Sequence, residues 1–339
     1  MPRPLTNGLA PASVLQPRIG LRTLPLFLEL GKARLSALVL FTTIVGFVLA
    51  SPDAVAWRQL AWTALGTSLA ALGANALNQW LEVARDARMQ RTRGRPLPSR
   101  RLTDTAALAF ALTAGAVGPL LLALAVSALA ALLALATLLI YVLIYTPLKV
   151  RTPLNTLVGA VVGALPPLVG WAAAAGQLEP GAWVLAGILF IWQIPHFLAL
   201  AWIHREDYRR GGFRMLPVLD PDGHLTGCIV VVYILLILPL ALALAFLGVA
   251  GWVYGVGSLL LGGGFLAAGV ALEGCRSRGA ARRVFLASVI YLPMLLGLML
   301  IDRRSGVADR AGLAATAPQH TARAAPSPPP PKEMRSVAG

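Results

Sequence analysis

Three polar side chains near the end of an apolar segment carry the clearest chemical signal in this chain. Asn78, Glu82 and Asp86 are spaced i, i+4 and i+8. In a helix each four-residue step turns only about 40°, so all three share one face. An amide and two carboxylates on one stripe offer the hard oxygen ligands that Mg²⁺ takes, usually alongside phosphates and water. A solvated helix end is the alternative, but acidic groups at a membrane boundary more often indicate a site.

A run of arginines follows this face directly. Guanidinium groups bind phosphates through paired N–H donors, so carboxylates that hold a metal, followed by arginines, are typical of a diphosphate site. Taken alone, the arginines are explained equally well as a positive loop on the cytoplasmic side of a membrane. The run comprises Arg85, Arg88, Arg91, Arg93, Arg95, Arg100 and Arg101.

A second candidate segment is the sequence YTPLKVRTPLN, residues 145–155. Lys149 offers a compact positive charge for a phosphate, and Tyr145 a phenol close to the membrane edge. Tyrosine and lysine at the end of a span are also common interface anchors. Considered alone, this segment favours the anchor interpretation.

The third candidate segment begins with WQIPHF, residues 192–197. Gln193 and His196 lie inside an otherwise apolar span, where polar groups tend to face a cavity. For His196, a hydrogen bond between helices and a contact with substrate are equally good explanations. Glu206 and Asp207 follow this span, and they either supply a second set of metal oxygens or pair with neighbouring arginines.

Composition places the chain in a membrane. Of its 339 residues 57% are hydrophobic and 13% charged, and the mean hydropathy is +0.73. The net charge of +15 comes from basic residues in loops between apolar segments, which excludes a nucleic-acid-binding tract with interleaved aromatics. Cys228 and Cys275 form no disulfide framework, and the sequence shows no zinc-ligand spacing. We assign His204, His224 and His320 to loops.

Stretches without charged residues predict nine spans. Two of these stretches, 105–148 and 223–272, exceed the length of one span of about 20 residues, so each predicts two. We expect the first to break at Gly118-Pro119 and the second near 248–251. The other predicted spans are 35–52, 59–81, 152–178, 180–203 and 284–301.

The distribution of basic residues predicts the orientation. With nine spans, 22 Lys and Arg residues fall on the side of the N-terminus and one, Arg58, in the loops of the other side. This bias predicts a cytoplasmic N-terminus, with the three candidate loops together on the cytoplasmic face. The predicted organisation is a basic tail over residues 1–23, a membrane domain over 24–301, and a disordered, proline-rich tail over 302–339.

Together these segments resemble the intramembrane prenyltransferases related to 4-hydroxybenzoate polyprenyltransferase. The resemblance covers about residues 25–301 and rests on three motifs. The first, which belongs to the wider superfamily, reads Asn78-xxx-Glu82-xxx-Asp86-xx-Met89-x-Arg91-Thr92-xx-Arg95-Pro96-Leu97. The second is YTPLKVRTPLN with GALPPLVGW at 163–171, and the third is WQIPHF with EDYRRGGFRMLP at 206–217. Of these, WQIPHF and GALPPLVGW resemble the haem-specific branch of the family.

The resemblance implies an all-α bundle of about nine transmembrane helices that opens to the cytoplasm, in a bacterial inner membrane. It implies farnesyl transfer from farnesyl diphosphate to a vinyl group of haem b, with addition of water, giving haem O for terminal-oxidase assembly. A haem A synthase or an oxidase assembly factor would then be the partner. Mg²⁺ would be bound by Asn78, Glu82 and Asp86, and by Asp207 or Glu206.

The resemblance also implies roles for the remaining candidates. The diphosphate would be bound by Arg91, Arg95 and Lys149, with Tyr145 close by, and haem by Trp192, Gln193 and His196. The segment EDYRRGGFRMLP departs from the family pattern, because Gly211 stands where many relatives have a second carboxylate four residues after Asp207. Two alternatives remain: prenylation of an aromatic acid for quinone synthesis, and, more distantly, a transporter.

Overall fold

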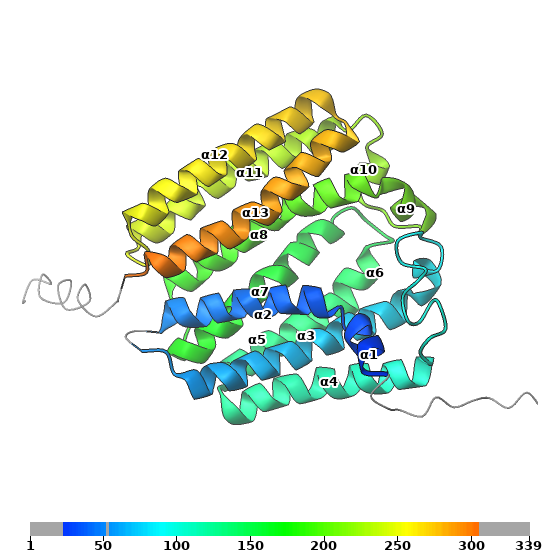
Figure 1. Cartoon of the computed structure of the whole chain (residues 1–339), viewed down its shortest axis with the longest axis horizontal. Helices are drawn as coiled ribbons and strands as arrows, with labels where there is room; N and C mark the ends of the chain where they lie inside the picture. Colours follow the sequence, from blue (N-terminus) through cyan, green and yellow to red (C-terminus); the bar gives the residue numbers. More distant parts are fainter. Residues whose placement is uncertain (1–22, 52–53, 305–339) are drawn as a thin grey trace, which may run out of the picture.

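The computed structural model describes residues 23–51 and 54–304, and the regular structure in these ranges is helical (Figure 1). Within them, nine helices are long and apolar enough to cross a membrane, which confirms the predicted all-helical membrane fold. They are α2 (Ala33–Ala50), α3 (Trp57–Asp86), α4 (Asp104–Ala125), α5 extended through η2 and α6 (Ala128–Leu148), α7 (Asn155–Ala175), α8 (Pro180–Ile203), α11 (His224–Phe246), α12 (Trp252–Cys275) and α13 (Arg278–Ile301).

Short helices gather at one end of this bundle, at the right in Figure 1. They are α1 (Leu24–Leu30), α6 (Thr146–Leu148), α9 (Arg205–Arg210) and α10 (Leu216–Leu219). The long loop between α3 and α4 lies at the same end, whereas α13 finishes at the opposite end. The three polar segments singled out in the sequence are therefore neighbours in space.

The predicted turn at Gly118-Pro119 is wrong. Both residues lie inside α4, which continues to Ala125 and is followed by a break at Val126 and Ser127. A Cβ at position 118 would collide with the backbone of Ala70, so glycine there allows α4 to approach α3 closely. Ser127 is the N-cap of the next helix, α5, because its side chain accepts a hydrogen bond from the Ala130 amide. The two spans are therefore separated at Val126 and Ser127. The second predicted break, near 248–251, is confirmed between α11 and α12.

Close approach of backbones also joins α2 to α7. A Cβ at Gly170 would collide with the carbonyl oxygen of Thr43, and one at Gly46 with that of Pro167. Because lipid tails are as apolar as leucine, such small-residue contacts and dispersion forces, rather than hydrophobic burial, hold membrane helices together.

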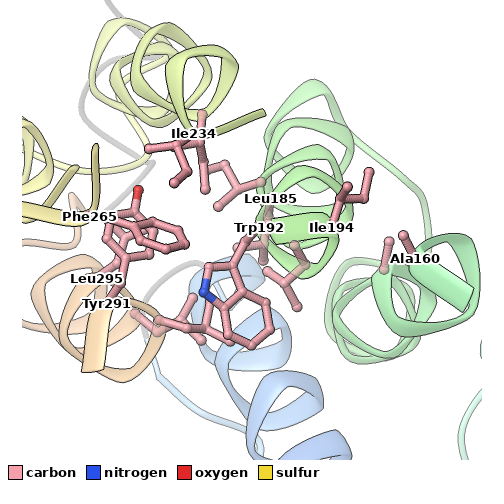
Figure 2. Close-up of a cluster of buried hydrophobic side chains, with 14 of the residues drawn as sticks. Ala160, Leu185, Trp192, Ile194, Ile234, Phe265, Tyr291 and Leu295 are labelled. Atoms are coloured by element: carbon pink, nitrogen blue, oxygen red, sulfur yellow. The ribbon is translucent and has the colours of Figure 1, made fainter. Parts of the chain in front are cut away.

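The largest apolar core lies between α8, α11, α12 and α13 (Figure 2). In this close-up, Trp192 extends from α8 into the core, Ile234 of α11 lies above it, and Phe265 of α12 lies beside Tyr291 and Leu295 of α13. Tyr291 stacks at a tilt on Phe265, with ring centroids 5.4 Å apart. This core packs α8 against α13, and these two helices carry His196 and Ser288.

Most of the two predicted tails lies outside the described residues, including the proline-rich stretch at 326–332 and His320. The described residues 302–304 pack against the bundle. The Arg303 guanidinium donates to the carbonyl oxygens of Val48 and Ser51, at 2.5 and 3.4 Å, at the end of α2.

Candidate active site

A cavity of about 220 Å³ opens among the polar segments at one end of the bundle. Four stretches line it: the α1–α2 junction, the end of α3 with its following loop, η2 with the turn after it, and α9–α10. Four of the lining residues are basic and two are acidic, so the cavity favours an anion. The lining residues are Lys32, Leu35, Glu82, Asp86, Met89, Arg91, Arg95, Tyr141, Tyr145, Lys149, Tyr208, Phe213 and Met215.

The predicted polar face of α3 is buried. Asn78 is 0%, Glu82 4% and Asp86 1% exposed. Glu82 and Asp86 line the cavity, whereas Asn78 lies one turn deeper along the helix. An ionised carboxylate is stable at such depth only with a partner of opposite charge, and each of these two has one.

The partner of Glu82 is Lys149, from the turn that follows α6. The Lys149 ammonium lies 2.9 and 3.1 Å from the two carboxylate oxygens and 4.8 Å from the centroid of the Tyr145 ring. Burial alone would lower the pKa of Lys149, but the adjacent Glu82 carboxylate outweighs it and raises the pKa above its usual value. Lys149 is therefore a permanent cation, and the structure brings it to the cavity as the sequence suggested.

Asp86 pairs with Arg95, whose Nη1 lies 2.6 Å from Oδ2. The other carboxylate oxygen, Oδ1, is buried and has no hydrogen-bond partner among the described residues. A buried acceptor without a partner costs about 1–3 kcal/mol, more when it is charged. This oxygen, in a cavity that also presents the Glu82 carboxylate, fits a hard divalent cation such as Mg²⁺.

Asn78 is oriented by a π-helical turn, η2 (Ile140–Tyr145). The hydroxyl of Thr146 donates to the carbonyl of Tyr141 and accepts from the Asn78 amide nitrogen at 3.0 Å. The Asn78 carbonyl oxygen must then face the other way, where it accepts from the ammonium of Lys32 at 2.7 Å. π-turns are uncommon and often occur at functional sites.

Lys32 is a cavity residue that the sequence analysis did not identify as a candidate. It stands between α1 and α2 with a left-handed backbone, φ 50°, that turns its side chain inward. Burial, reinforced by the cations Arg95 and Lys149, lowers the pKa of Lys32 to about 7. A lysine directly before an apolar span was the available signal, although many such residues are interface anchors.

Asp207 supports the loop after α3 instead of lining the cavity. Its carboxylate accepts hydrogen bonds from the backbone amides of Gln90 and Arg91, at 3.2 and 3.4 Å. Glu206 pairs with Arg209, at 2.8 Å, on the surface. Neither carboxylate is among the described residues that line the cavity, so a metal-binding role for either one stays a prediction.

Trp192 and His196 lie on the face of α8 that packs against α13. The indole nitrogen of Trp192 donates to the Ser288 carbonyl at 2.9 Å, and Nδ1 of His196 lies 2.8 Å from the Ser288 hydroxyl. The His196 ring stacks between Trp192 and Phe285, with centroids 5.0 and 4.9 Å away. We call these four residues the aromatic seam; none of them lines the cavity described above.

Gln193 points to another side of α8. Its amide nitrogen donates to the Leu189 carbonyl at 2.9 Å and approaches the Ala160 carbonyl of α7 at 3.5 Å. A Cβ at Gly163 would collide with this amide, so Gln193 fills the space over a glycine of α7. The three predicted haem contacts therefore do not share one surface.

Comparison with known proteins adds an independent line of evidence. Residues 39–292 match the model of the UbiA prenyltransferase family. A protoheme IX farnesyltransferase from Solibacter usitatus is 46% identical over 286 residues, which cover 82% of this chain and 98% of that protein.

Solved structures share the fold at low sequence identity. A digeranylgeranylglyceryl phosphate synthase aligns with a TM-score of 0.71 at 17% identity, over 83% of this chain and 98% of that one. A UbiA homolog from Archaeoglobus fulgidus bound to DMAPP and Mg²⁺ aligns with a TM-score of 0.58 at 13% identity, over 80% of this chain and 98% of that one.

Proposed function

Because this chain belongs to the UbiA prenyltransferase family, we propose that it transfers a farnesyl group from farnesyl diphosphate to a vinyl group of haem b. Water adds to the same vinyl group, and the product is haem O. The observation that carries this assignment is the 46% identity, over nearly the full length of the relative, to an enzyme named for this transfer. Quinone-type prenylation and transport have no comparable support.

We propose that Asn78, Glu82 and Asp86 bind Mg²⁺ in the cavity. The support is the pair of buried carboxylates in the cavity, above all Asp86 Oδ1 with its missing partner, and the place of Asn78 one turn deeper on the same helix. The Archaeoglobus protein of the same fold was solved with a prenyl diphosphate and Mg²⁺. When bound, the metal would neutralise part of the negative charge on the diphosphate.

The basic residues of the cavity would bind the diphosphate itself. Lys149, Arg91 and Arg95 line the cavity together with Lys32, and the phenol of Tyr145 lies against Lys149. As the C–O bond to the farnesyl group breaks, negative charge grows on the leaving diphosphate, and cations fixed in advance stabilise that charge. The allylic cation left behind would be attacked by the electron-rich vinyl group, inside an apolar bundle that keeps bulk water away.

His196 is the proposed haem contact, and its hydrogen bonding supports a specific protonation state. The Ser288 hydroxyl donates its one proton to the Phe285 carbonyl at 2.6 Å, so toward His196 it acts as the acceptor. Nδ1 of His196 then carries the ring proton, and Nε2 keeps its lone pair. An imidazole in this form suits contact with a haem iron or a nearby polar group. Trp192 stacks on the His196 ring, and Gln193 lies on another side of α8.

The proposed setting follows the same chemistry. The positive end of the bundle, with its cavity, would face the cytoplasm of a bacterium whose inner membrane holds the protein. Haem O is too apolar to diffuse freely in water. A haem A synthase or a terminal-oxidase assembly factor in the same bilayer would therefore receive the product.

The decisive test is product identification in cells that lack their own haem O synthase. Haems extracted from cells with and without this chain are compared by mass spectrometry. We expect a heavier haem that carries one farnesyl group plus water, absent from cells that express Asp86→Ala. Well-expressed protein that leaves haem b unchanged but prenylates 4-hydroxybenzoate in membranes would assign it to quinone synthesis instead.

A further inference from the structure

A second group of ligand-type side chains meets where α11 begins and α12 ends. His224 and Cys228 are one helical turn apart on α11 and share a face, and Glu273 lies opposite them on α12. One ligand atom of each residue lies within 4.8 Å of the other two. His224 was assigned to a loop and the cysteines to no site, because nothing in the sequence links positions 224 and 228 to Glu273.

The separations of these atoms are close to those of a tetrahedral zinc site. Nδ1 of His224 lies 3.2 Å from Oε1 of Glu273, and Sγ of Cys228 lies 3.8 and 3.9 Å from the two ring nitrogens. Zinc bonds of about 2.3 Å to sulfur and 2.0–2.1 Å to nitrogen or oxygen, at the tetrahedral angle, give separations of about 3.6 and 3.3 Å. The third separation, between Sγ of Cys228 and the Glu273 carboxylate, is within 4.8 Å, so side-chain movements of up to about 1 Å would complete the geometry.

The guanidinium group of Arg276 lies among these atoms. Nη2 of Arg276 lies 2.9 Å from Glu273 Oε1 and 3.0 Å from His224 Nδ1. A guanidinium group can only donate, so the Nδ1 lone pair of His224 faces this positive charge, as it would face a metal. Arg276 is 38% exposed and can swing into solvent to give an ion access.

We propose that His224, Cys228 and Glu273 bind a zinc-class divalent ion, which displaces the Arg276 guanidinium. Three protein ligands leave a fourth position for water, and the thiol loses a proton to solvent as it binds the ion. The sulfur and nitrogen donors select zinc over Mg²⁺, which prefers oxygen. None of these residues lines the cavity of the candidate active site, so the zinc site is separate from it, and it would clamp the beginning of α11 to the end of α12.

Cobalt provides a visible probe of this site. The full-length protein is purified in detergent with Cys275→Ser, which removes the other cysteine, and is titrated with Co²⁺. We expect a saturable thiolate-to-cobalt band in the near ultraviolet, with the visible bands of tetrahedral Co²⁺, that Zn²⁺ abolishes and Mg²⁺ does not. Further substitution of Cys228→Ser or His224→Ala removes the band. Arg276→Ala tightens binding at least about threefold, because the competing cation is gone.

Two outcomes would overturn the proposal. One is the absence of a saturable thiolate band in the Cys275→Ser protein; the other is a band that survives His224→Ala. Thiol alkylation gives a second measurement in the same background, because bound Zn²⁺ should slow the modification of Cys228 at least tenfold, and Glu273→Gln should weaken this protection. Prenyl-transfer activity equal to that of the parent shows that each variant is folded.

Discussion

The cavity of the candidate active site and the aromatic seam differ in the charge of their side chains, although both lie in the same bundle. The cavity assembles charged side chains from three separate stretches, and each buried carboxylate in it pairs with its own cation. The seam contains no charged group and places one imidazole between two aromatic rings, held by a single serine. These differences match the roles proposed above, with a polyanion and its metal in the cavity and a haem contact at His196 of the seam.

This contrast predicts that the two regions can be damaged independently. Substitutions in the cavity should affect farnesyl diphosphate and leave haem binding intact, and substitutions in the seam should do the reverse. A variant in one region that weakens the binding of farnesyl diphosphate and of haem equally would contradict the assignment of the two ligands to separate regions.

Asp86→Ala should have the largest effect. The substitution removes both the unpaired oxygen proposed for Mg²⁺ and the partner of Arg95, so we expect prenyl transfer to fall at least about 100-fold. The measurement is haem O formation in membranes supplied with haem b, farnesyl diphosphate and Mg²⁺. Asp104→Ala, an exposed carboxylate in the first turn of α4, is the matched control and should keep full activity. Similar losses in both variants would remove the special role of Asp86.

His196→Ala should weaken haem binding about tenfold, or about 1.4 kcal/mol, without changing the affinity for farnesyl diphosphate. The reason is the loss of the Nε2 lone pair and of the ring that Trp192 and Phe285 enclose. Haem affinity is measured by absorbance titration in detergent, and diphosphate affinity by calorimetry. His224→Ala, remote from both regions, is the control. An unchanged haem affinity in His196→Ala would exclude the seam as the haem site.

Asp207→Ala should cost less activity than Asp86→Ala, about tenfold. The carboxylate accepts hydrogen bonds from the amides of Gln90 and Arg91, so its loss loosens the loop that carries the arginines proposed to bind the diphosphate. We expect a higher KM for farnesyl diphosphate with an unchanged requirement for Mg²⁺. A loss as large as that of Asp86→Ala, with a shifted Mg²⁺ dependence, would instead support Asp207 as a metal ligand.

Trp192→Phe should have the smallest effect. Phenylalanine keeps the stacking on His196 but loses the hydrogen bond to the Ser288 carbonyl, which is worth about 1 kcal/mol of stability. A lower midpoint of thermal unfolding in detergent, with activity within twofold of the parent, is the expected result. Trp183→Phe, 58% exposed on the same helix, should leave the midpoint unchanged.

Features that depend on neighbours along the chain could be predicted from the sequence. Apolar runs of the right length predicted nine spans, because a span must cover the bilayer with its own residues. The helical repeat placed Glu82 and Asp86 on one face, and their burial in the structure agrees with it. The same local reasoning failed at Gly118, where glycine serves close packing against Ala70, a contact between two helices that no local pattern reveals.

The partner that each side chain contacts depends on the tertiary fold and could not be predicted from the sequence. It set Lys149 against Glu82, gave Asp207 to the backbone of the loop after α3, and turned Lys32 into the cavity. It also separated Gln193 from Trp192 and His196, and it brought Glu273 to His224 and Cys228. The physical reason is common to all five: a residue type fixes which interactions are available, but the packing of helices distant in sequence fixes which of them form.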